Sequence, residues 1–292
     1  MSFLNESVSM FLASNQPNNL QPAANFSTTL EQPLVLSDGR WCVALCGLNV
    51  WNTNPNITAA LGNNKINVCD NYTGGTGTWN SCVFPDGLYA ISDIITYFDN
   101  FIDTTYSAVN TNTILAINSP LLTCEWTINA QWGIDMSVSK IGSVLGFGVG
   151  QQTIGPVSGT QIYIGNLQAD ISNGISNYLV HCNCLDAGRS YVNGNPSDVI
   201  FSYTPSAPQG SLINYVPTFP IFMDATQATL SNIVVYITDQ RNNPVTLNVP
   251  GEYYNNPTSL QLVFVRKGDD IAKTQSVNAY NEKLQQGYGR RR

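Results

Sequence analysis

The main pattern along this chain is an alternation of apolar and polar residues with a period of two, which is typical of β-strands. Over residues 41–46 both alternating sets of side chains can be buried, so we expect a central strand covered on both faces. Residues 240–244 are expected to form a hairpin loop between two strands. The expected strands are 25–30, 41–46, 113–117, 121–128, 161–164, 178–182, 199–203, 232–238, 245–249 and 259–266.

One segment has a convincing helical period. The apolar residues between Ile91 and Ile102 fall on one face of a helix, with acidic residues elsewhere. We expect Ser92 to cap its N-terminus and Asp93 to lie in its first turn, where a carboxylate is favoured. Residues 269–286 are a second, weaker helix candidate whose apolar side chains could dock on a neighbour.

Many short strands, frequent turn residues and one helix predict an all-β sandwich or a closed double sheet. Lectins, barrels and viral capsid domains all use this architecture, and the periodicity does not choose between them. The 292 residues suffice for one large all-β domain or two smaller ones. Residues 62–82 and 185–210 are rich in glycine, proline and polar residues and are expected to form long surface loops.

The composition is unusually poor in charge for a protein with this much apolar material. Charged residues make up 11 % and apolar residues 43 %, whereas soluble domains usually carry about 25 % charged residues. Such a surface is unlike that of a freely diffusing enzyme and suits a protein whose flanks are covered by neighbours. No apolar run is long enough for a membrane-spanning helix, and the N-terminus does not resemble a secretory signal.

Charge is distributed unevenly along the chain. From Arg266 to Arg292 there are seven basic and three acidic residues, a net charge of +4, whereas the chain before Arg266 carries −11. An acidic body repels nucleic acid, but the basic tail could contact phosphates or an acidic partner. The residues expected to make such contacts with DNA or neighbouring subunits are Lys283, Arg290, Arg291 and Arg292; the alternative is a solvated terminus.

The sequence offers little chemistry for catalysis or metal binding. It has a single histidine, His181, and no Gly-x-Ser-x-Gly motif, so a hydrolase would have to use that histidine. Cys182 and Cys184 have strand spacing, and Cys42 and Cys46 also lie in an expected strand. We expect small buried thiols at these positions, in preference to a zinc site or a disulfide between the two segments. The interpretation is therefore that the protein is not an enzyme and holds neither a cofactor nor a metal ion.

Four segments carry motifs whose order along the chain is informative. The first has Asn18-Asn19, then Asn25-Phe26-x-x-x-Leu30, a proline-led apolar strand at 33–36, and Trp41-x-x-Ala44-Leu45. The others are Gly87-x-Tyr89 before the helix from Ser92 to Asp103, Leu145-Gly146-Phe147, and the closing strands 233–239 and 260–266, the last of which ends in a basic residue.

Together these segments, which span residues 18 to 266, resemble the minor capsid (penton) proteins of virophages and related Polinton-type viruses. The resemblance implies a jelly-roll sandwich of two four-stranded antiparallel sheets with one short helix and large loop or domain insertions. It further implies a homopentamer at the fivefold vertices of an icosahedral double-stranded DNA virus. Its partners would be hexavalent double jelly-roll major capsid proteins, and its location the virion, after synthesis in the host cytoplasm.

This resemblance leads to a domain hypothesis. A jelly-roll domain is expected over residues 14–266, interrupted by the two long loops, with the surplus central segment forming an outward-facing insertion domain; the basic tail is 267–292. The basic tail is expected to turn toward the particle interior. The alternative function is a lectin-like spike or host-receptor-binding module, for which Tyr72 and Trp79 would serve as stacking platforms for a glycan.

Overall fold

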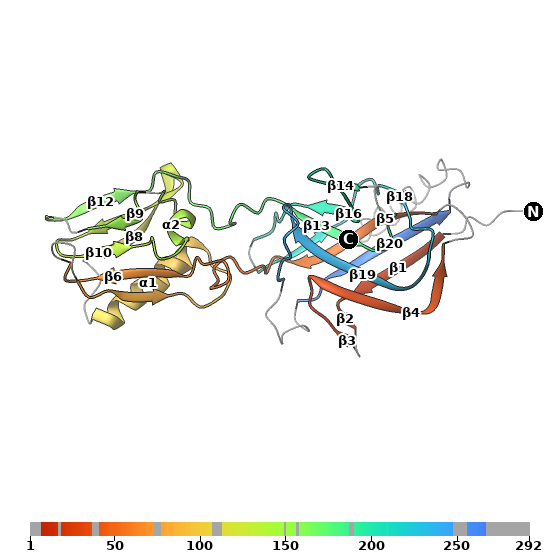
Figure 1. The fold of residues 1–292 in the computed structure, drawn as a ribbon, viewed down its shortest axis with the longest axis horizontal. Helices are drawn as coiled ribbons and strands as arrows, with labels where there is room; N and C mark the ends of the chain where they lie inside the picture. The colour runs from red at the N-terminus through yellow and green to blue at the C-terminus, as the bar shows by residue number, and fades with distance from the viewer. Residues whose placement is uncertain are drawn as a thin grey trace, which may run out of the picture. The chain divides into compact units, whose positions relative to one another are not determined.

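The chain divides into two compact units (Figure 1). Unit 1 comprises residues 1–51, 177–207 and 212–292, and unit 2 comprises 52–176 and 208–211. The structure is a computed structural model. It describes residues 7–16, 19–36, 41–72, 77–106, 113–148, 150–155, 158–186, 190–208, 210–247 and 256–266.

Unit 1 is built from two antiparallel sheets. In the first, the strand order is β1 (Ser7–Ala13), β20 (Ser259–Arg266), β5 (Trp41–Trp51) and β17 (Leu212–Tyr215), with β18 (Met223–Asp224) also paired to β5. In the second, the order is β16 (Val199–Tyr203), β13 (Tyr178–Cys182), β19 (Thr229–Asp239) and β4 (Asn25–Val35). Two short hairpins accompany them, β2 (Asn15–Gln16) with β3 (Asn19–Leu20) and β14 (Ser190–Val192) with β15 (Asn195–Ser197).

The strand order of unit 1 is that of a jelly roll. When these eight strand positions are numbered along the chain, with β17 and β18 sharing the sixth, the sheets have the orders 1-8-3-6 and 2-7-4-5. Neighbouring strands thus come from distant parts of the chain, as in two interlocked Greek keys. The predicted jelly-roll sandwich is confirmed, with the difference that one edge strand is split in two.

The core of unit 1 lies between the two sheets and follows the alternation of each strand. On β20 the side chains of Leu260, Leu262 and Phe264 are buried, whereas Gln261 between them is exposed. Every residue from Trp41 to Leu45 is buried, as expected for a strand covered on both faces. Burial of such apolar side chains supplies most of the stabilisation of a sandwich.

Unit 2 has its own core between two smaller sheets and a helix. One sheet has the order β11 (Thr153–Ile154), β10 (Gly133–Asp135), β6 (Lys65–Cys69) and β7 (Asn80–Val83), and the other β12 (Gln161–Ile164), β9 (Thr123–Ile128) and β8 (Thr113–Asn118). The helices are α1 (Ile91–Tyr106), the four-residue α2 (Ile141–Val144) and the 3₁₀ turn Ser119–Leu121. Trp126 is fully buried at the centre and meets Phe98 of α1 edge to face, with ring centroids 4.9 Å apart.

Helix α1 begins one residue before the expected cap. Ile91 is already helical, so Ser92 lies inside the first turn and its predicted capping role is wrong. The carboxylate of Asp93 instead accepts a hydrogen bond of 2.8 Å from the backbone N–H of Ala90. An acidic residue that reaches back in this way satisfies a backbone donor at the start of the helix. The predicted place of Asp93 in the first turn is confirmed.

Three expectations about loops and strands need correction. Residues 62–82 are not one long loop, because Ile66 and Val68 alternate with polar residues and are buried in β6. Residues 185–210 likewise contain the β14–β15 hairpin and β16. Residues 245–247, the described part of the expected strand 245–249, are not in a strand. The reason is that β4 already pairs with β19 up to Tyr236, so residues 244–247 after the turn make a single bridge, from Pro244 to Thr238.

The two ends of unit 1 carry different parts of the chain. Arg266 pairs with Trp41 and Ser7 pairs with Val265, so the first and last described residues both lie where β5 begins. The chain leaves for unit 2 after Trp51, at the other end of this strand. At about 3.3 Å per residue the two ends of β5 are about 33 Å apart.

The buried face of β20 allows a test of the sandwich core. Phe264→Ala is expected to lower the free energy of unfolding of unit 1 by about 3–5 kcal/mol, because it removes a fully buried ring and leaves a cavity. The side chain of Gln261 on the same strand is exposed, so Gln261→Ala should change the free energy of unfolding by less than about 0.5 kcal/mol. Urea denaturation measures both, and equal effects would contradict the inward orientation of Phe264.

Candidate functional site

His181 on β13 is buried in a polar network inside unit 1. Its Nδ1 lies 2.7 Å from Oδ1 of Asp198, and its Nε2 lies 2.9 Å from the hydroxyl of Thr238. The ring stacks on Tyr236 with centroids 4.2 Å apart and planes 10° from parallel. The Tyr236 hydroxyl donates to the carboxylate of Asp198, with its two oxygens at 2.9 and 3.1 Å. Both ring nitrogens of the histidine therefore have partners.

This network has the order carboxylate, imidazole and hydroxyl that a hydrolase uses, but its geometry is that of a structural network. His181 is 1 % exposed and Thr238 is 4 % exposed, so a substrate could not reach the hydroxyl. A nucleophile must lie beside an open site where a reacting atom can be placed. The burial of the network gives the hydrolase hypothesis no support and favours a role in holding β13 and β19 together.

Asp198 is ionised in this network. Burial alone would raise the pKa of its carboxyl, but the hydrogen bonds from His181 and Tyr236 oppose burial, and the net effect is a pKa below the ordinary value. An ionised carboxylate can only accept hydrogen bonds, so Nδ1 of His181 carries the proton between them. The folded state thus favours the charged form of Asp198.

The lowered pKa of Asp198 makes stability depend on pH. Its contribution is fully present above the unfolded pKa, about 3.9, and is lost as the pH falls through the lower folded pKa. Asp198→Asn should therefore flatten the fall in the free energy of unfolding of unit 1 below about pH 4. Tyr236→Phe keeps the ring but removes one donor and should flatten it less. Urea denaturation across this range measures both, and an unaltered slope for Asp198→Asn would exclude this network as its source.

The cysteines are thiols, as expected. All seven are reduced thiols in the structure, and Cys182 and Cys184 have their sulfur atoms 2.8 Å apart inside unit 1. The hydrogen bond with Cys182, together with burial, raises the pKa of Cys184, so this thiol stays protonated. Within the described ranges, His, Cys, Asp and Glu nowhere gather in the groups of three or more that could hold a metal ion.

Tyr72 and Trp79 lie together in unit 2 but pack against the protein. Their rings meet edge to face with centroids 5.2 Å apart, and both side chains are half-buried. Both also cover Gly133 on β10, where an added Cβ would lie 3.0 Å from the ring of Tyr72 and 3.1 Å from that of Trp79. Each ring is thus packed partly against other groups of unit 2, which gives the glycan-platform hypothesis no support.

The predicted tail residues Lys283, Arg290, Arg291 and Arg292 lie outside the described residues, as does the helix candidate 269–286. Their proposed contacts therefore stay predictions. Among the residues that the structure does describe, no helix combines the length and the apolar character needed to cross a membrane.

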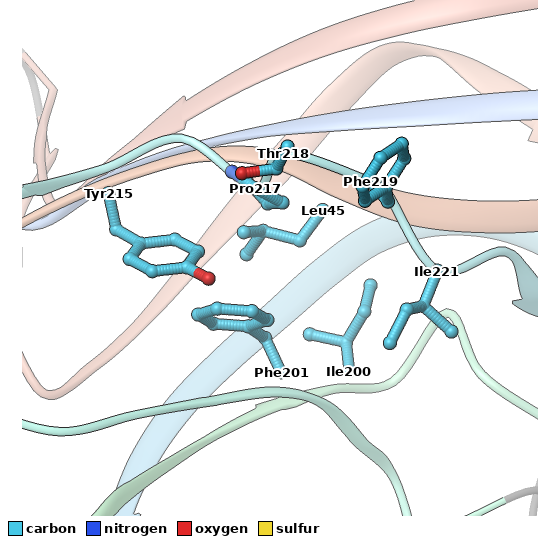
Figure 2. A pocket seen from close by; sticks show the side chains of 8 residues that line it. All are labelled: Leu45, Ile200, Phe201, Tyr215, Pro217, Thr218, Phe219 and Ile221. Carbon is cyan, nitrogen blue, oxygen red and sulfur yellow. The ribbon is translucent and has the colours of Figure 1, made fainter. Parts of the chain in front are cut away.

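An apolar groove of about 250 Å³ lies at the edge of unit 1 (Figure 2). Leu45, Ile200 and Phe201 line one part of it, and side chains between Tyr215 and Ile221 line the rest. The rings of Phe201 and Tyr215 lie 4.7 Å apart between centroids. Side chains from both sheets of the sandwich thus contribute to one groove.

The groove forms where the edge strand of the first sheet is interrupted. β17 ends at Tyr215 and β18 begins at Met223, and both pair with β5. Between them lie Pro217 and Pro220, which have no N–H to donate to a ladder and so break the pairing. The chain therefore leaves β5 between two paired segments and carries its apolar side chains outward.

The exposed side chains of this segment are large and apolar. Phe219 is 78 % exposed, Ile221 71 % and Val216 68 %. No charged residue occurs anywhere from Val199 to Met223. Exposed aromatic groups and an absence of charge are features of the centre of protein interfaces. Sequence reasoning missed this surface, although the uncharged run was a signal for it.

Comparison with known proteins is informative at the level of structure. No family model matches the sequence, and no curated protein matches it. The crystal structure of the mavirus penton protein, however, matches over 89 % of this chain and 99 % of its own, with a TM-score of 0.50 and 10 % sequence identity.

The fold of this chain is similar to that of the mavirus penton protein. The Sputnik virophage structure determined by cryo-electron microscopy also matches, over 89 % of this chain and 98 % of its own, with 13 % identity and a TM-score of 0.45. The resemblance expected from the order of the four sequence motifs is confirmed at the level of the fold.

Proposed function

We propose that this chain is a minor capsid protein that forms the homopentameric penton of an icosahedral DNA virus. The observation that carries the proposal is the jelly-roll strand order of unit 1, together with a fold similar to that of the mavirus penton protein over most of both chains. In this role the protein is a structural component of the virion. Its other neighbours are the hexavalent capsomers of the major capsid protein.

The low charge of the chain supports a role in assembly. A ring of identical subunits needs two different surfaces on each copy, one complementary to the other. An isolated soluble protein gains solubility from charged residues on its surface, yet most residues that line the groove of unit 1 belong to the uncharged run 199–223. A neighbouring subunit that covers this surface removes its apolar side chains from water.

The positions of the chain ends suggest how the subunit is oriented in the shell. Unit 2, residues 52–176 and 208–211, contains eight acidic and two basic residues, a net charge of −6. It is attached at the end of β5, whereas residues 266–292, with a net charge of +4, start from Arg266 at the opposite end. Phosphates repel the first and attract the second. We therefore place the tail toward the packaged DNA and unit 2 toward the outside.

No catalytic activity is part of this proposal. The histidine network is buried, and the groove is lined by apolar and aromatic side chains with one threonine. General acid–base or nucleophilic catalysis draws on an activated side chain beside the bound substrate, such as a histidine, a carboxylate or a thiolate. The lining residues of the groove include none of these, which suits a binding surface.

The mass of the assembled protein tests the pentamer. The purified chain, of 31.8 kDa, is expected to form particles with five times the mass of one copy. Native mass spectrometry or light scattering measures this directly. If the folded, purified chain keeps the mass of a single copy at high concentration, the proposed ring is excluded.

Removal of the tail tests the proposed orientation. A chain without residues 269–292 should retain the unfolding free energy of unit 1 but enter particles poorly, because the basic contacts with DNA or neighbouring capsomers are lost. A full-length control that replaces Lys283, Arg290, Arg291 and Arg292 by serine removes only the charge and should be impaired as well. Incorporation is measured by quantifying the chain in purified particles, and normal incorporation of both variants would contradict an inward role for the tail.

A further inference from the structure

We infer that the apolar groove of one copy binds the β1–β4 side of the next copy, an assignment that rests on the proposed ring. The strand orders give the sandwich two sides. On one side the sheets end in β16 and in β17 with β18, and this groove side carries the groove of Figure 2. On the other side, the β1–β4 side, the sheets end in β1 and β4, which lie against each other.

Both sides carry little charge for exposed sheet edges. On the groove side, β16 and β17 lie in the uncharged run 199–223, and the one acidic residue is Asp224 at the end of β18. On the β1–β4 side, residues 7–30 are uncharged, and the one acidic residue is Glu31 in β4. Even at the low chain average of 11 %, segments of this length would be expected to carry several charged side chains. Natural proteins place lysine and other charged residues on edges to prevent pairing with other chains. Two edges on opposite sides with one acidic and no basic residue each therefore indicate that both are covered after assembly.

The β1–β4 side offers an aromatic side chain suited to an apolar surface. Phe11 on β1 is 69 % exposed, and its neighbours along the strand are not charged. An exposed phenylalanine gains stabilisation when it enters an apolar groove, and aromatic residues are enriched at interfaces. Phe11 is thus the expected anchor of this side, as Phe219 and Ile221 are of the groove side.

The size and position of the groove favour a second copy over other occupants. Its volume of about 250 Å³ is below the range of about 300–1,000 Å³ typical of pockets for small ligands. Groove-to-groove contact would be symmetric and would close as a dimer, whereas contact between two different sides continues into a ring. The contact of the groove side with the β1–β4 side is therefore the one compatible with five copies.

Photo-crosslinking in the full-length chain identifies the neighbour. A benzoylphenylalanine at position 219 should crosslink to a peptide within residues 7–36 of another copy, which mass spectrometry of mixed light and heavy isotope-labelled subunits detects as intermolecular. A matched probe at Ile162, which is 62 % exposed on unit 2, should not crosslink to that peptide. A crosslink from position 219 to the groove segment of another copy, or to a different protein, would overturn the assignment.

Charge substitutions provide an independent test. Phe219→Asp and Phe11→Asp should each weaken the contact between subunits about 30-fold, as expected for loss of an interface anchor. Both positions are exposed, so the circular dichroism spectrum and the melting temperature of the separated subunit should stay unchanged. The control Ile162→Asp should leave five copies intact.

Mixing the two interface variants makes the result specific. The Phe11→Asp variant retains an intact groove side, and the Phe219→Asp variant retains an intact β1–β4 side. The two variants can therefore bind each other through these sides, and native mass spectrometry should show a species with one copy of each. If the unmodified chain forms no ring, the proposed function fails. If it forms five copies but Phe11→Asp or Phe219→Asp leaves them unaffected, only the assignment of the two sides fails.

Discussion

The burial of apolar side chains between two sheets is the interaction on which the rest of unit 1 depends. The central strands β5, β20, β13 and β19 each pair on both sides and direct alternate side chains, such as Phe264 and Val235, into the shared core. This arrangement satisfies the backbone of the central strands but leaves four strand positions at the edges. The edges of a sandwich are thus a direct result of its core, and they are the places where another chain can add contacts.

The interrupted edge strand shows how local chemistry modifies this plan. A continuous strand along β5 would leave a regular edge, but Pro217 and Pro220 prevent pairing between β17 and β18. The chain between them exposes Phe219 and Ile221 and opens a groove down to Leu45, which is itself 2 % exposed. Loss of a few ladder hydrogen bonds thereby creates an apolar surface that association can bury.

The insertion of unit 2 is tolerated because it brings its own core. Trp126, Phe98 and the buried face of α1 pack together in a cluster formed by unit 2 alone. Asn52, the first residue of unit 2, is hydrogen-bonded to its short second segment, residues 208–211. The backbone N–H of Asn52 donates to the carbonyl of Ser211 at 2.9 Å, and its carbonyl accepts from the N–H of Gly210 at 2.8 Å. A long insertion costs little closure entropy beyond that of a short one, so a jelly roll can carry such a domain between two strands.

Sequence reasoning alone predicted the strands whose apolar period is complete, such as β13 and β20, and the helix α1. It also predicted the jelly-roll class, through the order of the motifs. It did not predict β6, whose buried Ile66 and Val68 are surrounded by asparagine and glycine. Nor did it predict the absence of a strand over residues 245–247, where β4 already occupies the edge of β19 up to Tyr236. The partners of His181 and the groove beside Leu45 were decided only by the tertiary structure. The physical reason is that a period reports which residues are buried, whereas strand pairing between distant segments decides which side chains meet and which edges stay open.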